Sequence, residues 1–503
     1  MGVEKEDSDS KFTPKIYVIT AAQAIQSEEH ADKMPWGADS SRGAPNQNFL
    51  RALEKYCDKR GAELEILSMS GMDNTETELH PQILKMGEKE NVQILYSMWE
   101  KERQLNNNIK ISGMVEPPQN MDIPTTRDRF IQKDQSVVMA FTKQRLRCVP
   151  TGNSRFPKLI AGTGVCTFPN YNIDESMAVG NRRADIALRD HTFGAVVVEV
   201  VSPKNYNLRH LPVQLNGKFV DLGRKFDEDG KSPRVGVEAL VLGDLHVGSL
   251  DELTMQANYE MIGFFKPKRL VLHDLADSES INPYEKDDYI LRAVKAKLGM
   301  LDLEKELKEI NKVLWELSKA VGRDKEILVT HSNHDNFIYR YVAEGNFPRD
   351  STNAEIGSYL FEHVVRESVR RRNPYEAVNL MIEEGIKRVG KIPSNVKFLK
   401  LGEDYRVWGY QLANHGHKGH SGGRGSTTSQ ELMSGKTITG HTHSPELLRN
   451  AVVVGTSSRL DMGYKIGEGS KWMAGNAVLY DQGLVQLIPI INGKWKMASE
   501  KIR

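Results

Sequence analysis

The sequence predicts an α/β protein with more than one domain. Short apolar runs typical of strands alternate with amphipathic helical stretches along most of the 503 residues, which is the pattern of an α/β fold. Polar residues of the kinds that bind ligands follow several of these runs, as they do where parallel strands end at a binding site. At about 100–200 residues per domain, the length corresponds to about two to four domains.

The first half of the chain is predicted to form an α/β accessory domain over residues 14–230, after a charged, flexible segment at residues 1–13. A strand is expected from Ile16. A helix over residues 48–60 should end at Gly61, because glycine favours the left-handed conformation that terminates helices. Further strands are expected at residues 63–69, 136–142, 159–167 and 195–201, a polar loop at 105–135, and a domain boundary at 221–234.

The second half is predicted to form another domain over residues 235–490, with a C-terminal tail at residues 491–503. Strands are expected at residues 237–242, 269–272, 326–330, 396–401, 405–413, 436–439 and 451–456, and helices at residues 251–265, 285–321, 352–372 and 374–388. From Leu303 to Val321, apolar residues recur at spacings of four and three. Because this pattern covers less than three heptads, we expect a helix packed on a sheet rather than a coiled-coil seam. The pattern also indicates association into a homo-oligomer.

The composition excludes several classes of protein. The 68 Lys and Arg residues balance 67 Asp and Glu residues, so any basic surface must be local. No uncharged apolar run reaches about 18 residues, and we therefore expect no membrane span. The acidic amino terminus lacks the apolar core of a signal peptide. Three widely spaced cysteines form neither a disulfide framework nor a metal knuckle, which favours the cytoplasm.

Five short motifs place metal-ligand residue types at the ends of predicted strands. They are Gly243-Asp244-Leu245-His246, His273-Asp274, Ser332-Asn333-His334-Asp335, Asn414-His415-Gly416-His417 and Gly440-His441-Thr442-His443. Any one of them could be an ordinary polar turn, but five in succession, each after an apolar strand, are not expected by chance. Since the carboxyl ends of neighbouring parallel strands meet at one edge of a sheet, we expect one shared site.

The chemistry of these residues indicates a dinuclear metal centre. Seven candidate ligands are too many for one ion, but an aspartate shared between two ions accounts for the number. Carboxylate and amide oxygens mixed with imidazole suit Mn(II), Fe or Zn better than Ca(II). Two ions about 3.5–4 Å apart would clamp phosphoryl oxygens and lower the pKa of a water between them, so no Ser, Cys or Lys nucleophile is required.

In their order, the motifs resemble the signature of the calcineurin-like metallophosphoesterases. That signature is Asp-x-His, Gly-Asp, Gly-Asn-His-(Asp/Glu), a His-Gly element and Gly-His-x-His. The resemblance covers residues 235–490 and implies a four-layer αββα sandwich built on two stacked sheets. Two positions depart from the pattern, because His273 and Ser332 stand where the family has glycine. Both are backbone positions, so the departures affect the expected turns more than the expected chemistry.

The resemblance also implies a role for each residue. Three groups of metal ligands follow from it: Asp244, His246 and His443 for a first metal, Asn333, His415 and His441 for a second, and Asp274 as the bridge. His334 would stand over the phosphate as a general acid or transition-state stabiliser, and Asp335 would orient it. The implied cofactors are two divalent ions, with Mn(II) expected and Mg, Fe or Zn as alternatives.

A glycine-rich segment follows the fourth motif, Lys418-Gly-His-Ser-Gly-Gly-Arg424-Gly-Ser-Thr-Thr428. Glycines let backbone N–H groups approach an anion closely, and Lys418, His420 and Arg424 add positive charge. The segment is therefore expected to bind a phosphodiester backbone; the alternative is a flexible connector whose glycines only permit a turn. Aromatic residues are sparse around the other basic clusters, which favours contacts to the DNA backbone over contacts to bases.

A second resemblance extends to the whole chain. Residues Val18–Gln23, the pair Tyr56-Cys57 and the run His415–Gly419 are similar to the metallophosphoesterases of large tailed phages, in particular the pre-early DNA-transfer proteins of the T-five group. This resemblance implies an early phage nuclease, related in its catalytic domain to SbcD-type repair nucleases, that degrades host DNA in the host cytoplasm with Mn(II). Residues 14–230 would shape the DNA path, mediate assembly, or only complete the fold.

Three functions stay open at this point. The first is a two-metal DNA nuclease. The second is a phosphomonoesterase, small-molecule phosphodiesterase or protein phosphatase with the same ligand set. The third is a non-catalytic scaffold that keeps the fold alone. All seven candidate ligands and His334 are present, which favours an enzyme.

Overall fold

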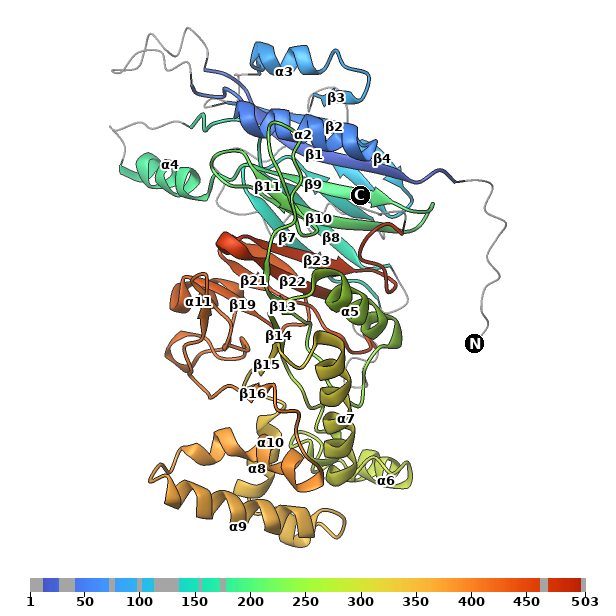
Figure 1. Ribbon diagram of the computed structural model, residues 1–503, viewed down its shortest axis with the longest axis vertical. Helices are drawn as coiled ribbons and strands as arrows, with labels where there is room; N and C mark the ends of the chain where they lie inside the picture. Colours follow the sequence, from blue (N-terminus) through green and yellow to red (C-terminus); the bar gives the residue numbers. More distant parts are fainter. Residues whose placement is uncertain are drawn as a thin grey trace. The chain divides into compact units, whose positions relative to one another are not determined.

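The computed structural model describes residues 12–26, 41–71, 77–96, 102–112, 135–152, 156–171, 178–461 and 469–498. The chain forms two compact units. The first comprises Met1–Arg234, Gly469–Lys471 and Lys494–Arg503, and the second comprises Val235–Glu468 and Trp472–Gly493. Both units mix strands and helices (Figure 1), which confirms the α/β class. Of the predicted flexible segment, residues 1–11 lie outside the described residues.

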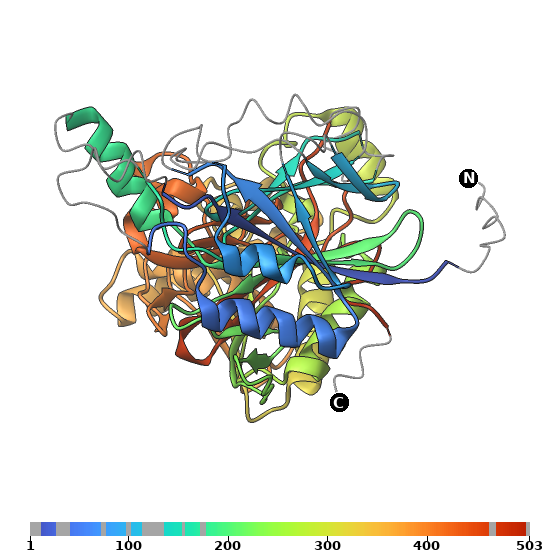
Figure 2. The same ribbon diagram turned by 90° about the horizontal axis from the view of Figure 1, so that it is seen from above.

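The first unit contains a five-stranded mixed sheet with the order β10-β9-β1-β2-β3. Its strands are β1 (Lys15–Gln23), β2 (Glu63–Met69), β3 (Val92–Leu95), β9 (Gly194–Val200) and β10 (Tyr206–Pro212). β1, β2 and β3 run parallel, whereas β9 is antiparallel to both β1 and β10. Helices α2 (Gln47–Arg60) and α3 (Pro81–Met86) bury side chains in one apolar cluster with this sheet. Figure 2 shows both helices on the same side of β1.

Helix α2 shows how local sequence sets an element of this unit. At its start, the Asn46 side chain accepts a hydrogen bond from the Phe49 N–H. At its end, Gly61 adopts φ 61°, the left-handed conformation that glycine tolerates best. Phe49, Leu53 and Tyr56 all lie on the buried face. The predicted helix and its glycine terminator are thus confirmed.

A second sheet of the first unit contains β4 (Glu102–Asn106), β5 (Ile109–Ser112), β6 (Ser136–Met139), β7 (Gln144–Val149) and β8 (Lys158–Thr163), paired in the order β7-β8-β6-β5-β4. The β4–β5 hairpin corrects the prediction of a loop from residue 105. The Asn106 side chain builds the turn by accepting from the backbone N–H groups of Asn108 and Ile109. Residues 113–134 of that predicted loop lie outside the described residues. The unit also has α4 (Ala178–Asp190) and the hairpin β11 (Phe219–Asp221)–β12 (Arg224–Phe226).

The second unit contains a six-stranded sheet with the order β16-β15-β14-β13-β22-β23. Its strands are β13 (Val237–Val241), β14 (Arg269–Leu272), β15 (Glu326–Val329), β16 (Val396–Phe398), β22 (Ala474–Tyr480) and β23 (Val485–Ile490). β13 to β16 run parallel, and β22 is antiparallel to β13 and β23. The parallel strands put the ends that carry the predicted motifs at one edge.

Another sheet of the second unit pairs strands in the order β17-β18-β19-β21-β20. These strands are β17 (Arg406–Val407), β18 (Tyr410–Gln411), β19 (Lys436–Thr439), β20 (Glu446–Leu448) and β21 (Ala451–Val453). β18, β19 and β21 run parallel, so the segments after β18 and β19 also leave from one edge. The two sheets agree with the α/β class, while the four-layer αββα sandwich stays a prediction.

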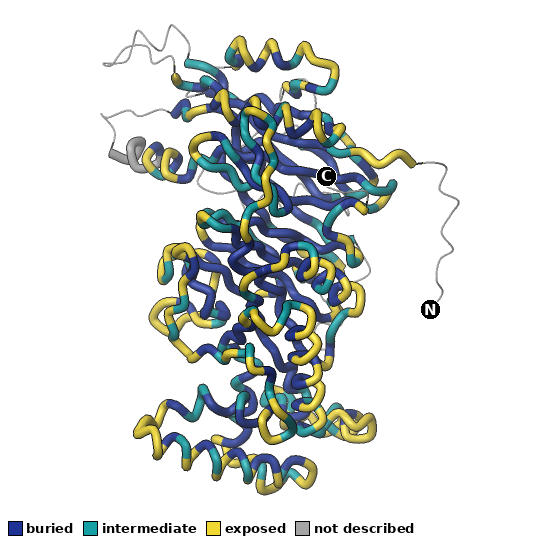
Figure 3. Tube along the Cα trace, in the orientation of Figure 1, coloured by how far each residue is buried: buried dark blue, intermediate teal, exposed yellow. Residues whose placement is uncertain are grey.

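Seven α-helices lie in the described part of the second unit. They are α5 (Glu252–Phe265), α6 (Tyr289–Lys297), α7 (Leu303–Val321), α8 (Asn336–Ala343), α9 (Ala354–Arg370), α10 (Glu376–Val389) and α11 (Thr427–Ser434). Three 3-10 turns, η2 (Glu279–Ile281), η3 (Phe347–Arg349) and η4 (His420–Gly422), join them. Figure 3 shows that the strands are buried, whereas α6 and α9 keep exposed sides.

The single helical stretch predicted at residues 285–321 is two helices. Gly299 adopts φ 69° after α6, and the Asp302 side chain caps α7 by accepting from the Lys305 N–H. The apolar stripe that begins at Leu303 is buried within the unit, where α7 contacts α5 and α10. The stripe therefore does not lie open as a coiled-coil seam, and a homo-oligomer stays a prediction. No described helix is long and apolar enough to traverse a bilayer.

Candidate metal centre

The predicted motifs converge at the ends of adjacent strands of the second unit. The segments after β13 and β14 pair through backbone hydrogen bonds, in which the N–H groups of Leu245 and His246 donate to the carbonyls of His273 and Asp274. Near the end of β15, His331 forms a parallel bridge with Asn414, beyond β18. These pairings bring together motifs that lie far apart in the sequence.

Four buried side chains form the first group. The Nε2 atoms of His246 and His443 are 2.9 Å apart. The Oδ2 atom of Asp244 lies 3.1 Å from His443 Nε2, and the Oδ2 atom of Asp274 lies 3.5 Å from His246 Nε2. One ligand atom from each of the four residues lies within 4.8 Å of all the others. This group contains the three ligands predicted for a first metal and the predicted bridge.

A second group shares Asp274 with the first. Asp274, His415 and His441 can also bring one ligand atom each within 4.8 Å of one another. His415 Nε2 lies 3.1 Å from Asp274 Oδ2 and 3.1 Å from Asn333 Oδ1. Asn333 and Asp274 therefore both lie next to His415 Nε2, and His441 completes the set predicted for the second metal. Asp274 belongs to both groups.

The spacing of the donor atoms suits binding to a shared cation better than hydrogen bonding among themselves. Two neutral imidazole nitrogens cannot bond at 2.9 Å unless one of them carries a proton. Ligand atoms at about 2.0–2.1 Å from one ion, with bonds near right angles, lie about 3 Å apart. Asp244 Oδ1 is buried and has no hydrogen-bond partner among the described residues. These buried groups could therefore hold a metal ion, although the donor set alone does not fix its identity.

The charges of the site shift the pKa values of its ligand residues, and a bound cation would take the place of a proton. Burial would lower the pKa of His246, but its hydrogen bond to Asp277 and the charge of Asp274 raise it to about 9. Burial would raise the pKa of Asp274, but His415 and His334 hold it well below its usual range. Ligand imidazoles must be neutral to bind a metal, so a divalent ion would displace the His246 proton.

Several ligands adopt an unusual backbone conformation. His246, Asp274, His441 and His443 have φ values of 50°, 40°, 76° and 55°, in the left-handed region that residues with side chains rarely adopt. Such residues cost free energy on the order of 1 kcal/mol each and concentrate at functional sites. Gly440 is required for a different reason, because a Cβ there would lie 2.0 Å from Asp244 Oδ1. The backbone is thus shaped to aim side chains at one point.

The ring of His334 hydrogen-bonds to the backbone carbonyl of Asp277, and no hydrogen bond joins it to the predicted Asp335 in the described part of the chain. His334 Nδ1 lies 3.0 Å from the Asp277 carbonyl oxygen and 3.9 Å from its Oδ1. Asp335 instead accepts a hydrogen bond from the Ala276 backbone N–H. The reason is that Asp335 stands at the start of α8, where its side chain turns toward the loop after β14. Asp277 lies only three residues after Asp274 in the sequence, and this spacing is the signal that could have identified it.

The two departures from the family pattern have structural roles. His273 is fully buried, with Nδ1 2.9 Å from Thr330 Oγ1 and 3.4 Å from His415 Nδ1. Burial lowers the pKa of His273 to about 4. Ser332 is also buried, and its Oγ accepts from the Asp335 N–H. Both side chains are therefore accommodated next to the ligand set.

The glycine-rich segment packs closely against its neighbours. A Cβ at Gly425 would lie 1.7 Å from the Gly416 carbonyl oxygen, so backbone passes directly over backbone. Gln430 on α11 donates to the carbonyls of Gly416 and Lys418 and fixes the segment from the other side. Helix α11, which the sequence did not predict, starts from a capping box at Ser426.

The three basic side chains of this segment, Lys418, His420 and Arg424, are exposed. No hydrogen bond or ion pair joins them to other side chains in the described part of the chain. Burial and the charge of Lys418 lower the pKa of His331 to about 4, which places this ammonium group close to the end of β15. The candidate DNA-contacting charges are thus free and lie beside the ligand cluster.

Comparison with known proteins gives one significant similarity. The chain is 24% identical over 474 residues to Protein A1 of Escherichia phage T5, and this alignment covers 90% of the chain and 80% of that protein. The alignment is too long to lie within one unit, so the similarity to a phage protein extends over both units. No family model matches the chain, and no solved structure matches it.

Proposed function

We propose that the second unit binds two divalent metal ions and hydrolyses phosphodiester bonds of DNA. The observation that carries the proposal is Asp274, a buried carboxylate that belongs to two convergent groups of ligand atoms. A shared carboxylate is the arrangement that two-metal phosphoesterases need, because both ions must face one phosphate. The αββα metallophosphoesterase fold and its Mn(II) preference belong to the same proposal.

The ligand assignment is the one that the family resemblance implies, and the two groups agree with it. Asp244, His246 and His443 would hold one ion, Asn333, His415 and His441 the other, and Asp274 both. When bound, the ions supply positive charge for the phosphate oxygens and lower the pKa of the attacking water. The chain itself holds the ligands rigidly. The His441 backbone N–H donates to the Asp244 carboxylate at 2.7 Å, so the side chain of one ligand is fixed to the backbone of another.

His334 would transfer a proton to the leaving oxygen. Its ring lies 4.5 Å from that of His246 between ring centroids, and its side chain keeps about one sixth of its surface exposed, enough to face a bound phosphate. The Asp277 carbonyl oxygen, 3.0 Å from Nδ1, favours a proton on that nitrogen and directs Nε2 outward. Asp277 therefore positions both His246 and His334, with one carboxylate oxygen 3.3 Å from His246 Nδ1.

DNA is proposed as the substrate on two grounds. The free cations Lys418, His420 and Arg424 lie beside the ligand cluster on a folded segment, where they suit a polyanion better than a small ester. The similarity to a phage protein, which agrees with the resemblance to phage nucleases noted in the sequence, is the second ground. Host DNA in the host cytoplasm would be the target of such an early phage protein.

One experiment tests both the chemistry and the substrate. Plasmid DNA and a small nitrophenyl phosphate ester are incubated with the protein and Mn(II), Mg(II) or EDTA. We expect metal-dependent cleavage of DNA, which His334→Ala abolishes while about two ions per chain remain bound. Arg424→Ala should weaken DNA binding and reduce its salt dependence, yet leave hydrolysis of the small ester intact.

Each outcome bears on a separate part of the proposal. Loss of metal from His334→Ala would show that His334 is a ligand and contradict its role as an acid. Intact DNA together with rapid hydrolysis of the small ester would replace the nuclease with a phosphatase. Equal loss on both substrates in Arg424→Ala would remove the folded segment from DNA binding. No hydrolysis of either substrate with any metal would leave a scaffold.

A further inference from the structure

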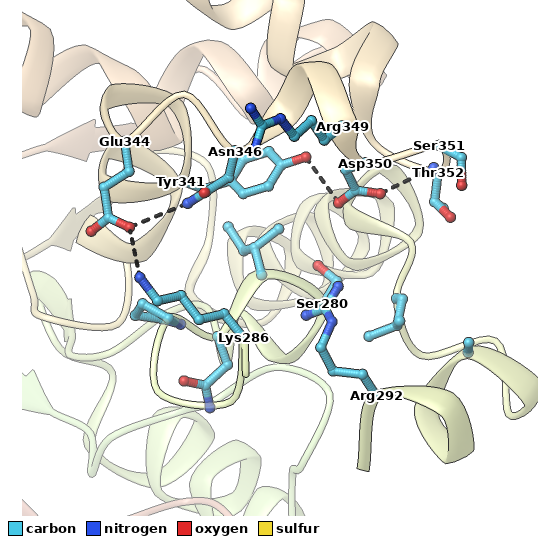
Figure 4. Close-up of a pocket in the computed structure, with 15 residues that line it drawn as sticks. Ser280, Lys286, Arg292, Tyr341, Glu344, Asn346, Arg349, Asp350, Ser351 and Thr352 are labelled. Carbon is cyan, nitrogen blue, oxygen red and sulfur yellow. Dashed lines mark hydrogen bonds and ion pairs between the residues drawn. The ribbon is translucent and has the colours of Figure 1, made fainter. Parts of the chain in front are cut away.

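A second polar site lies in the second unit, away from the ligand groups. It is a pocket of about 380 Å³ between η2 and α6 on one side and α8 and η3 on the other. Three cations line it: Lys286 after η2, Arg292 on α6 and Arg349 on η3. Figure 4 shows Arg292 and Arg349 on opposite sides of the pocket. Charges that approach one cavity from separate elements repel each other and are kept together only by the fold.

The anions of the pocket already have donors. Asp350 accepts hydrogen bonds from the Tyr341 hydroxyl at 2.9 Å and from the Thr352 N–H at 3.0 Å. Glu344 accepts from Arg340 and Asn346, both at 3.2 Å. Figure 4 shows these carboxylates held within the wall of the pocket. The three cations outnumber these two carboxylates, so the lining of the pocket keeps an excess of positive charge.

The two guanidinium groups lack such partners. In the described part of the chain, no hydrogen bond or ion pair joins the side chain of Arg292 or Arg349 to another group. Lys286 differs, because its Nζ lies 3.9 Å from Glu344. Each guanidinium presents five N–H donors in a planar fork. A cavity that two guanidinium groups without protein partners line from different sides is suited to an oxyanion.

The size of the pocket narrows the ligand further. About 380 Å³ exceeds what a lone phosphate fills and lies in the range that binds small organic molecules. The Ser351 and Thr352 hydroxyls and the Asn282 amide also line it and could bond a sugar or a base edge. We propose that this pocket binds a phosphate-bearing ligand of nucleotide size, with Arg292 and Arg349 as its phosphate ligands.

The pocket shares two segments with the candidate metal centre. Ser280 follows Asp277 by three residues, and Tyr341 stands on the helix that starts directly after Asp335. Between these segments, the Ser278 hydroxyl donates to the His334 carbonyl oxygen. A ligand in the pocket would therefore contact the same two segments that position His334. The ligand may be supplied free in solution or as part of a DNA strand, and the binding chemistry is the same in both cases.

Binding to metal-free protein tests the pocket without depending on hydrolysis. Full-length wild type in EDTA is titrated calorimetrically with inorganic phosphate, with deoxyadenosine monophosphate and with a six-residue thymidine oligonucleotide. Arg292→Gln and Arg349→Gln should each weaken binding of at least one nucleotide probe by about tenfold, and the double variant by more. Arg366→Gln is the control, because it removes an exposed arginine of the same unit that lies outside the pocket.

The two nucleotide probes distinguish a free nucleotide from a DNA strand as the source of the bound phosphate. Arginine-dependent binding of the monophosphate identifies a free nucleotide, and arginine-dependent binding of the oligonucleotide alone identifies a DNA strand. The double variant should unfold at the same temperature as wild type, since neither side chain has a partner to lose. Unchanged binding of all three probes by a folded double variant, or an equal loss in Arg366→Gln, would overturn the proposal. Neither result depends on whether the metal centre cleaves DNA.

Discussion

Each unit buries a cluster of charged side chains, and the two clusters differ in the groups that lie against their carboxylates. In the first unit, Arg209 is fully buried and makes two hydrogen bonds to Asp221, at 2.6 and 2.9 Å, and an ion pair to Glu199 at 2.8 Å. Arg60 contacts the same two carboxylates at 2.7 and 3.0 Å. Every anion of this cluster thus has a cation from the chain itself, and nothing has to be added.

In the second unit, the buried acceptors face each other. Asp244, Asp274 and two imidazole nitrogens point at one place, and no Lys or Arg side chain contacts them among the described residues. The comparison teaches how to distinguish a structural charge cluster from a functional one. Burying charge is costly in both cases, but in the second cluster only imidazoles lie against the carboxylates in the described part of the chain, and these are groups that could hold a metal ion.

The largest expected effect tests the second cluster. Asp274→Ala removes the carboxylate common to both groups, so it should abolish binding of both ions and lower any turnover by at least about thousandfold, since a metal contributes several kcal/mol to the transition state. Metal content by atomic emission and cleavage of DNA measure the two effects. Asp324→Ala, which removes an exposed carboxylate of the same unit, should change neither. Full metal content in Asp274→Ala would break the comparison.

A smaller effect, on stability alone, is expected in the first cluster. Asp221→Asn leaves Arg209 buried without its closest anion and should lower the free energy of unfolding by about 3–5 kcal/mol, measured by urea denaturation. The loss should be the same with Mn(II) and with EDTA. Asp229→Asn, which disrupts the exposed pair with Lys231, should have little effect. If added metal restored the stability of Asp221→Asn, the two clusters would not be distinct.

The pH dependence of that loss has a definite sign. Burial would raise the pKa of Asp221, but Arg209 and Arg60 hold it well below its usual range. A carboxyl with a depressed folded-state pKa contributes stability above its unfolded pKa of about 3.9 and loses it as the pH falls. Wild type and Asp221→Asn should therefore differ most near neutral pH and converge in acid.

The smallest effect concerns a buried acid that belongs to neither cluster. Glu306 on α7 accepts from the Ser280 hydroxyl and N–H, and burial raises its pKa to about 7. A carboxyl with a raised folded-state pKa reduces stability as the pH rises from about 4.5 through 7. Glu306→Gln should consequently have a free energy of unfolding about 1–2 kcal/mol higher than wild type at pH 8 and the same as wild type at pH 4, measured by urea denaturation at both pH values. A constant difference across this range would assign the effect to packing instead.

Sequence reasoning was most successful where backbone direction decides the outcome. The predicted bounds of β2 and β14 agree with the structure, because apolar runs between turn residues mark strands clearly. All seven predicted ligands come together, since parallel strands in register end at one edge. These are properties of the chain path, which periodicity and strand order describe.

Side-chain direction and helix starts were harder to predict. The resemblance implied Asp335 as the residue that orients His334, but the spacing of a motif does not tell which way a side chain turns after the last residue of a loop. Helices α8 and α11 were missed since both begin in segments rich in turn-forming residues, and a single capping residue such as Ser426 gives only a weak signal. The arginine pocket could not be predicted at all, because its elements meet only through tertiary packing.

The path of the chain has a consequence for when each unit can complete its fold during synthesis. The Met497 backbone N–H donates to the buried Glu199 carboxylate at 2.7 Å, and Trp495 is almost completely buried. These residues belong to the first unit, yet they are translated after the whole of the second. The first unit, although it is synthesised first, therefore cannot complete its fold until the residues that follow the second unit have been made.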